Sequence, residues 1–372
     1  MSEFNASNFK KEEGGQGPDI IGTAELTSPY FMVPPSGTTA ERPSGCAPGT
    51  LRFNTDIGSL EYFKGDTIGW ESIVKTTPNL GGGTGSNVGL GGRAIYGTSS
   101  SPYPMEYITI STLGNSQDFG DLNDVKYWGG GLGSRTRGVV GGGYNGVDTI
   151  QFCTFAQLGN FTDFGNLTDG RHQMNALSNE IRGCFVCGTG PAHVNTIDYI
   201  TISATGNAVD FGDCTRTSSY IMTASSTTRG LIAGGNSNVI DYITIMTTGN
   251  AADFGDLDNI SNEMGGQVTS ATRAVFGGGK SPATTNVMEY ITMATLGNSI
   301  DFGDLATARY QIDAGVTSSP TRGIFGGGST GSGVNIIEYI EIATTGNALD
   351  FGDFITADIS SSASMSNSHG GL

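Results

Sequence analysis

The sequence predicts an all-β protein, a six-bladed β-propeller preceded by a small N-terminal β-meander. Two observations carry this prediction. Of the 372 residues, 60 are glycine and only 14% are charged, while Ser, Thr, Ile, Tyr and Phe are frequent. This composition favours strands joined by tight turns. The second observation is a repeat of 43 to 49 residues that occurs six times between residues 93 and 353, which indicates a repeated structural unit.

Each repeat contains the same four landmarks. An Arg followed by Gly or Ala and apolar residues comes first, and then an acid-Tyr-Ile element. A Gly-Asn pair follows, and an Asp-Phe-Gly sequence begins three residues after its Asn. In the second copy the acid-Tyr-Ile element is replaced by Gln151-Phe152-Cys153. The aspartates of the six Asp-Phe-Gly sequences are Asp118, Asp163, Asp210, Asp253, Asp301 and Asp350.

The landmarks predict four short strands per repeat. In the last repeat these are a weak strand near Ile312–Ser318, an apolar strand from Arg322, a strand at Ile337–Ile342, and a fourth that carries Asp350-Phe-Gly. Four strands in 40–50 residues are typical of a propeller blade. Glycine runs followed by an aromatic strand resemble the kelch repeat, with Phe in place of its usual tryptophan. A β-solenoid is the alternative, but its repeats are usually shorter.

Asp-Phe-Gly also occurs in protein kinases as a metal-binding motif, but a kinase has one copy beside a catalytic loop and a strand lysine. We therefore expect a structural turn in which the Asp, as in Asp118, caps backbone N–H groups and the Gly takes a positive φ. The phenylalanines should fill the space between blades. They are Phe119, Phe164, Phe211, Phe254, Phe302 and Phe351.

The charge argues against several classes of partner. The formal net charge is −17 with a pI near 4.4, so a basic footprint for duplex nucleic acid or an anionic membrane is absent. No run approaches eighteen consecutive apolar residues, and the first residues, MSEFNASNFKKEEGGQG, lack the apolar core of a secretory signal. We expect no nucleic-acid partner and no membrane insertion.

The sequence predicts no catalytic residue, no metal site and no cofactor. Cys184 and Cys187 form a lone CxxC without a second pair, and small apolar packing is the favoured interpretation. No Ser-His-Asp set is indicated by spacing. A structural Ca²⁺ is an open alternative at the acids that follow each Asp-Phe-Gly, although a solvated acidic turn is favoured. These positions are Asp121, Asp213, Asp256, Asp304 and Asp353, with Asn166 in the second copy.

The predicted organisation has three parts. Residues 1–18 form a polar N-terminal arm that is flexible or ordered by a partner. Residues 19–80 form a docking segment with a meander of strands at Thr50–Asn54, Ser59–Phe63 and Gly69–Ile73. Residues 81–372 form the propeller. Its C-terminal Ile359–Gly371 should pair with the blade that contains Arg93 and close the ring.

The segment Pro34–Trp70, the Gly-Asn…Asp-Phe-Gly-Asp repeat and the ending Ser366–Leu372 resemble tail-fibre and other virion structural proteins of tailed phages, especially those that infect cyanobacteria. The resemblance implies a non-enzymatic viral protein, located in the virion and assembled in the host cytoplasm. Its N-terminal segment would dock to tail, baseplate or capsid proteins, and its propeller would face outward toward host glycan or protein. The resemblance leaves open whether the chain forms a homo-oligomer. The alternatives are a capsid decoration protein without a ligand and a glycan-active depolymerase.

The loops predict which face makes contact. From the acid position to the Asp of Asp-Phe-Gly the spacing is constant in all six copies, whereas the connection between the second and third strands varies. Variable loops are typical of binding surfaces, although drift under no constraint is the alternative. The candidate contact residues on this face are Tyr103, Tyr144, His193 and Lys280.

The repeated charges predict ion pairs within blades. Because an inward-facing carboxylate needs a partner, we expect the repeat arginine to pair with the acid of the acid-Tyr-Ile element, the next blade being the alternative partner. The expected pairs are Arg93–Glu106, Arg182–Asp198, Arg229–Asp241, Arg273–Glu289 and Arg322–Glu338, and Arg137, opposite Gln151, needs another acceptor.

Overall fold

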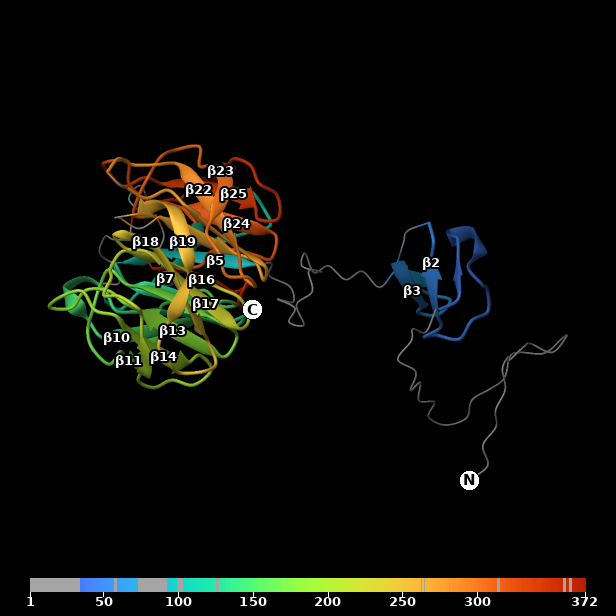
Figure 1. Cartoon of the computed structure of the whole chain (residues 1–372). Coiled ribbons are helices and arrows are strands. Elements are labelled where there is room, and N and C mark those ends of the chain that lie inside the picture. The colour runs from blue at the N-terminus through green and yellow to red at the C-terminus, as the bar shows by residue number, and fades with distance from the viewer. Residues whose placement is uncertain are drawn as a thin grey trace, which may run out of the picture. The chain divides into compact units, whose positions relative to one another are not determined.

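The structure, a computed structural model, describes residues 34–56, 59–72, 92–98, 103–124, 127–261, 263, 265–280, 282–312, 315–356, 359–360 and 363–372. The chain divides into two compact units, Met1–Thr76 and Thr77–Leu372 (Figure 1). Three parts of the sequence prediction lie outside the described residues: the arm at residues 1–18, the end of the third meander strand at Ile73, and residues 76–91 before the first repeat.

The described residues are nearly all-β. Two short 3₁₀ segments, η1 (Thr39–Glu41) and η2 (Tyr144–Gly146), are the exceptions. No helix in the described part of the chain is long and apolar enough to span a membrane.

The first unit is one small sheet. Its strands are β1 (Ser36–Gly37), β2 (Leu51–Asn54), β3 (Ser59–Phe63) and β4 (Trp70–Ser72), in that order across the sheet. β1 runs parallel to β2, and the other pairs are antiparallel. β2, β3 and β4 lie where the meander was predicted, and Gly65 and Gly69 adopt positive φ in the turn between β3 and β4.

Six antiparallel sheets make up the described part of the second unit, and this fold is β-propeller-like. Five sheets have four strands and one has three. The sheets, each with its strands in spatial order, are: β27 (Ser364–Ser366), β5 (Arg93–Gly97), β6 (Pro104–Thr109) and β7 (Gln117–Asp121); β8 (Gly130–Gly133), β9 (Arg137–Gly141), β10 (Thr149–Thr154) and β11 (Thr162–Asn166); β12 (Asn175–Ser178), β13 (Arg182–Val186), β14 (Thr196–Thr201) and β15 (Val209–Asp213); β16 (Ile221–Ser225), β17 (Arg229–Gly234), β18 (Ser237–Thr244) and β19 (Ala252–Ser261); β20 (Gly266–Thr269), β21 (Arg273–Gly277), β22 (Val287–Thr292) and β23 (Ile300–Asp304); β24 (Arg322–Gly326), β25 (Ile336–Glu341) and β26 (Leu349–Asp353).

The first strands of successive sheets lie beside one another, with β27 next to β8, β8 next to β12, β12 next to β16, and β16 next to β20. Of the predicted first strand at Ile312–Ser318, residues 313 and 314 lie outside the described residues. In the described residues this segment makes only isolated bridges, from Gly315 to Gly131 and from Ser318 to Gly323. Gly315 takes a φ of 157°, and its backbone lies against that of Ser364.

Each sheet junction is held by three hydrogen bonds that involve the repeat motifs. At the junction of the β12–β15 and β16–β19 sheets, Gly249 donates its N–H to the carbonyl of Phe211 (2.8 Å). The N–H of Asp213 donates to the side-chain oxygen of Asn250 (3.1 Å), and Ala251 donates its N–H to the carbonyl of Asp213 (2.8 Å). The Gly-Asn pair of one sheet therefore clasps the Asp-Phe-Gly strand of the preceding sheet.

The same clasp occurs at all six junctions, and in the sixth the first repeat clasps the last. The Gly-Asn pair at Gly114 binds Phe351 and Asp353 as the others bind their predecessors. The glycine N–H to phenylalanine carbonyl bonds are Gly114–Phe351, Gly159–Phe119, Gly206–Phe164, Gly249–Phe211, Gly297–Phe254 and Gly346–Phe302. The asparagine side-chain bonds are Asn115–Asp353, Asn160–Asp121, Asn207–Asn166, Asn250–Asp213, Asn298–Asp256 and Asn347–Asp304.

These contacts correct the expected role of the motif aspartate. Asp118 and its five counterparts are exposed, and the asparagine of the next sheet, rather than the aspartate, accepts the free backbone N–H. The six motif phenylalanines are buried, with 1–2% of their surface exposed. Each lies at the edge of a tyrosine or phenylalanine ring of its own sheet; the ring centroids of Tyr242 and Phe254, for example, are 6.2 Å apart.

The five predicted arginine–acid pairs are wrong, and the strand register explains why. In the pair of β5 and β6, Arg93 lies opposite Thr109, and Glu106 lies opposite Tyr96. Arg93 and Tyr96 are three residues apart on one strand, so their side chains project to opposite faces of the sheet. The same register places the arginine and the acid on opposite faces of the sheet in the other four predicted pairs, Arg182–Asp198, Arg229–Asp241, Arg273–Glu289 and Arg322–Glu338.

The repeat arginine instead links two sheets. Arg93 lies over the ring of Tyr107, 4.6 Å from its centroid, and donates to the carbonyl of Phe155 on the next sheet (2.7 Å). Arg137 does the same with Phe152 and Ile202, so the absence of an acid at Gln151 changes nothing for it. The remaining carbonyl acceptors are Ile245 for Arg182, Met293 for Arg229, Ile342 for Arg273 and Ile110 for Arg322.

The buried acids bind the connection that leads into their own sheet. Asp198 accepts from Arg171 (2.8 Å) and from the N–H and hydroxyl of Thr168. Gln151 uses its Oε1 to accept from the N–H of Asn123 (2.9 Å), so the amide replaces the carboxylate as acceptor. The prediction that these acids need a partner was right, but the partner comes from the connecting loop.

The C-terminal segment pairs with the first repeat, as predicted. β27 is antiparallel to β5, with Met365 opposite Ile95. Beyond β27 the chain runs along the first strands of other sheets, where His369 is buried and its Nε2 lies 3.0 Å from the carbonyl of Gly133. Its Nδ1 accepts from the N–H of Gly371 (3.1 Å). These bonds define a neutral ring with the proton on Nε2.

We predict that the clasp tolerates no side chain at the glycine of Asp-Phe-Gly. Gly212 has a φ of 141°, and a Cβ there would lie 2.6 Å from the backbone of Gly249. Gly249 is a matched control, because its φ is 149° but nothing lies within 4 Å of its Cβ position. In both alanine variants the positive φ should lower the free energy of unfolding by about 1–3 kcal/mol. Gly212→Ala should lose a further ~1–3 kcal/mol in thermal unfolding through overpacking. Equal losses in the two variants would contradict the clasp geometry.

We also predict that His369 makes the second unit acid-sensitive. Burial lowers the pKa of His369 from 6.5 to about 4, and the charge of Arg135 acts in the same direction. The unfolded chain therefore takes up a proton before the folded one. The contribution of the neutral His369 ring to the free energy of unfolding should be fully present above pH 6.5. The free energy of unfolding should then fall by about 3 kcal/mol as the pH drops toward 4. Denaturant unfolding across this range measures the loss. His369→Gln, which cannot be protonated, should flatten this part of the profile, and an unchanged slope would refute the assignment.

Candidate binding face

Two kinds of loop meet on one face of the second unit. One kind joins the second and third strands of a sheet, and the other leads from the fourth strand into the next sheet. They pair through isolated bridges, His172 with Thr189 and Glu263 with Lys280. The loop face is therefore built from the variable connections that sequence analysis selected and from the connections that precede each first strand.

The four predicted contact residues have different surroundings on this face. Tyr103 is half-buried and contacts the apolar cluster around Phe119. Tyr144 is 45% exposed. His193 Nδ1 lies 2.9 Å from the hydroxyl of Thr189. Lys280 forms an ion pair with Glu263 (3.3 Å) and lies over the ring of Tyr310. The four do not form a single site, but Tyr144 belongs to a larger aromatic cluster.

We call this group the aromatic cluster: Tyr127, Trp128, Tyr144, His172 and Tyr220. Trp128 is its centre, stacked between Tyr127 (centroids 4.3 Å apart) and His172 (5.7 Å). The rings of Tyr144 and Tyr220 meet it at an angle, at 5.8 and 6.1 Å. Aromatic side chains with polar edges on a loop surface are suited to binding carbohydrate or protein.

The repeat positions these residues by an unusual backbone conformation. Trp128, Gln173 and Tyr220 lie just before β8, β12 and β16, with φ angles of 62°, 55° and 54°. Gln311, with a φ of 52°, precedes the segment that was predicted as the first strand of the last repeat. Positive φ costs free energy in residues other than glycine, so the surrounding structure must hold them there. Sequence analysis missed Trp128, His172 and Tyr220. The available signal was a large side chain recurring one or two residues before β8, β12 and β16.

Polar groups in the cluster are only partly satisfied. Gln173 donates through Nε2 to the hydroxyl of Tyr220 (2.5 Å) and accepts from Thr189 (2.9 Å). The buried Nε1 of Trp128 and Nδ1 of His172 have no hydrogen-bond partner. A buried donor without a partner is costly, and a ligand or water that satisfies it gains that energy. Because both nitrogens are buried, the exposed ring of Tyr144 is the part of these three side chains that a ligand can contact directly.

Burial also shifts the titration of this cluster. It lowers the pKa of His172, and the neighbouring His193 adds to this effect. Burial together with the charge of Glu263 raises the pKa of Tyr220 to about 12. Both rings are therefore neutral at neutral pH, and the cluster presents hydrogen-bonding groups without a fixed charge.

The cysteines and acids form no metal centre in the described part of the chain. Cys184 and Cys187 are buried in an apolar cluster, and the sulfur of Cys187 lies 2.8 Å from that of Cys214. No group of three or more His, Cys, Asp or Glu side chains gathers where it could hold a metal ion among the residues that the structure describes.

Comparisons with known proteins give a likeness in fold alone. No family model matches the chain, and no curated protein matches it. A solved structure of YjhT is similar with a TM-score of 0.52 and 10% sequence identity, over 63% of this chain and 86% of that chain. At this identity the likeness supports the β-propeller-like fold and transfers no site.

We predict that His172 titrates below its ordinary range and that Trp128 reports it. In a Trp70→Phe variant Trp128 is the remaining tryptophan, and protonation of the stacked imidazole quenches indole fluorescence. Because burial lowers the pKa of His172, the quenching midpoint should lie below 6.5. A second substitution, His172→Gln, should abolish the transition. A midpoint at or above 6.5 would show that the ring is not desolvated as described.

Proposed function

We propose that the second unit is a closed six-bladed propeller. Its support is the circular series of junctions, in which the first repeat clasps the last through Gly114 and Phe351, and the pairing of β27 with β5. The likeness to YjhT agrees with a propeller without fixing the number of blades. A closed ring leaves no free sheet edge and presents its loops at two ends.

The protein is, in this proposal, a non-enzymatic structural protein of a tailed-phage virion, a tail-fibre or surface-appendage component. The phage-like motifs support the virion role, and the aromatic cluster supports host attachment by the loop face. The observation that carries the binding function is the exposed ring of Tyr144, which packs against Tyr127 and Trp128 in the aromatic cluster on the loop face. The ligand would be a neutral host-surface glycan or a protein loop, because the cluster lacks a fixed charge.

Two alternatives make different demands on the same face. A decoration protein would need no ligand, and the aromatic cluster would then have no binding role. A depolymerase would need free carboxylates near the ligand, and the nearby Glu263 is engaged by Lys280 (3.3 Å) and Gln311 (3.1 Å). This engagement favours binding over hydrolysis.

We predict that Tyr144→Ala slows adsorption of particles to host cells by about tenfold, equivalent to ~1.4 kcal/mol. The loss of an exposed ring removes ligand contact without disturbing a core. Leu158→Ala is the matched control, because Leu158 is 58% exposed on the turn between β10 and β11, away from the aromatic cluster. Its adsorption should equal that of the unmodified particle. Equal adsorption of the Tyr144 variant, or absence of the protein from purified particles, would contradict the proposal.

A further inference from the structure

The third repeat carries two cysteines at positions where the other repeats carry different residue types. Cys187 is the fifth residue after the repeat arginine, and Cys214 directly follows the Asp-Phe-Gly-Asp sequence. The counterparts of Cys187 are Gly142, Gly234, Gly278 and Gly327, with Thr98 in the first repeat. The counterparts of Cys214 are the large apolar residues Leu122, Leu167, Leu257, Leu305 and Phe354.

The backbone at the position of Cys187 favours glycine. The four glycines there have φ angles between 66° and 77°, and Cys187 keeps this conformation with a φ of 52°, which costs free energy in a residue with a side chain. The large apolar residue also lies close to this position. A Cβ at Gly142 would lie 3.4 Å from Leu167, and one at Gly278 would lie 3.2 Å from Leu305. The third repeat changes both residues together, so that one gains a side chain where the other becomes smaller.

The fold holds the two cysteines against each other. Cys187 donates its N–H to the carbonyl of Thr196 (2.9 Å), and Cys214 donates its N–H to the carbonyl of Asn195 (2.8 Å). They therefore lie on the two sides of the chain that enters β14, because β13 and β15 flank β14 in the sheet. Their sulfur atoms are 2.8 Å apart, and both residues are free thiols.

We propose that Cys187 and Cys214 are a modification site at which a small-molecule disulfide, such as oxidised glutathione, creates a cross-link within one sheet. The Cys214 thiolate attacks the reagent and releases one thiol, and the Cys187 thiolate then attacks the mixed disulfide and releases the second. The protein loses two electrons and two protons, and the reagent gains them. This inference goes beyond the proposed function, because it does not depend on a ligand of the loop face.

The cross-link would stabilise the sheet and the loop face together. It would tie the end of β13 to the end of β15 and close residues 188–213 into a loop, which restricts the unfolded chain. The connection between β13 and β14 carries Thr189 and His193, and Thr189 pairs with His172 on the loop face. The bond would therefore fix the base of this connection.

Burial determines when the cross-link forms. Cys187 is 0% exposed and Cys214 is 4% exposed. Hydrogen bonding to Cys187, followed by burial, raises the pKa of Cys214. Because the thiolate is the species that attacks a disulfide, the folded protein should react slowly, and the reaction should be completed while the sheet is forming. Once made, the bond would be shielded from reductants in the same way.

Peptide mapping of the refolded full chain tests the proposal. The chain is refolded with oxidised glutathione, its free thiols are alkylated, and it is digested without reduction. Chymotrypsin is suitable, because cleavage after Phe185 and Tyr199 separates Cys184, Cys187 and Cys214. Mass spectrometry should find the peptides of Cys187 and Cys214 linked and the other three cysteines alkylated. Alkylation of all five cysteines, or linkage chiefly through another cysteine, would overturn the proposal.

A double variant separates the effect of the cross-link from other effects of the oxidant. Cys187→Gly with Cys214→Leu restores the residues of the other repeats, so this variant should fold. Oxidation should raise the unfolding temperature of the unmodified chain by roughly 5 °C and leave that of the double variant unchanged. Cys153→Ala removes another buried cysteine and should keep the shift. An equal shift in the double variant, or none in the unmodified chain, would refute a stabilising cross-link at this site.

Discussion

The clasp between a Gly-Asn pair and the Asp-Phe-Gly strand of the preceding sheet is the contact on which the second unit depends. It fixes the distance between neighbouring sheets, because the glycine of Asp-Phe-Gly lies directly against the backbone of the next glycine. The buried motif phenylalanine and the stacked arginine then fill the same junction.

The sequence predicted the repeated part of the fold well, because the fold is periodic where the sequence is. The strands that carry the arginine, acid-Tyr-Ile and Asp-Phe-Gly elements, and the pairing of β27 with β5, follow directly from spacing. The arginine partners could not be predicted in the same way. Their choice depends on strand register, which places Arg93 and Glu106 on opposite faces. The clasp by Asn250 was also missed, because it joins residues of different repeats.

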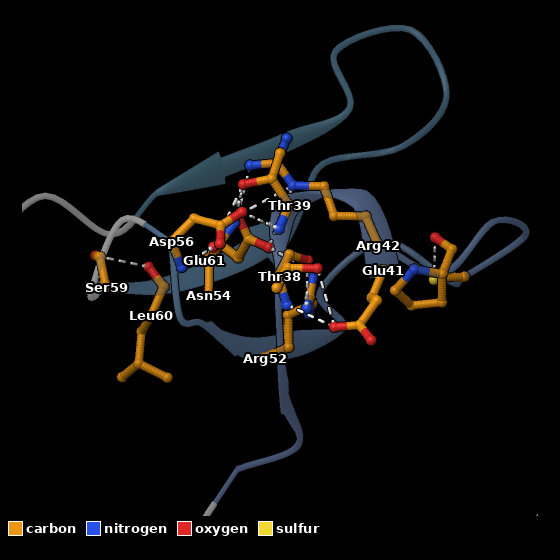
Figure 2. Close-up of polar contacts among 12 residues, drawn as sticks. Thr38, Thr39, Glu41, Arg42, Arg52, Asn54, Asp56, Ser59, Leu60 and Glu61 are labelled. Carbon is orange, nitrogen blue, oxygen red and sulfur yellow. Dashed lines mark hydrogen bonds and ion pairs between the residues drawn. The ribbon is translucent and has the colours of Figure 1, made fainter.

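The aromatic cluster was harder to foresee because it is not periodic. Trp128 and Tyr220 share a backbone position with Gln173 and Gln311, so the repeat fixes where these side chains lie but not what they are. Functional side chains are therefore expected at positions where the six repeats carry different residues, and structural side chains at positions where the repeats carry the same residue. In the first unit, the strands were predictable from turns and alternation. The burial of Glu61 on the same face as Phe63, and the exposure of Leu60 on the other face, became clear only in the structure (Figure 2).

Hydrogen exchange of the backbone amides after Asp-Phe-Gly tests the clasp most directly. These amides belong to Asp121, Asn166, Asp213, Asp256, Asp304 and Asp353, and each donates to an asparagine side chain of the next sheet. All six should be protected to a similar degree, and Asn250→Ala should release Asp213 while leaving the other five unchanged. Exchange of these amides at the rate of an open turn, or protection of Asp213 that survives Asn250→Ala, would contradict the account.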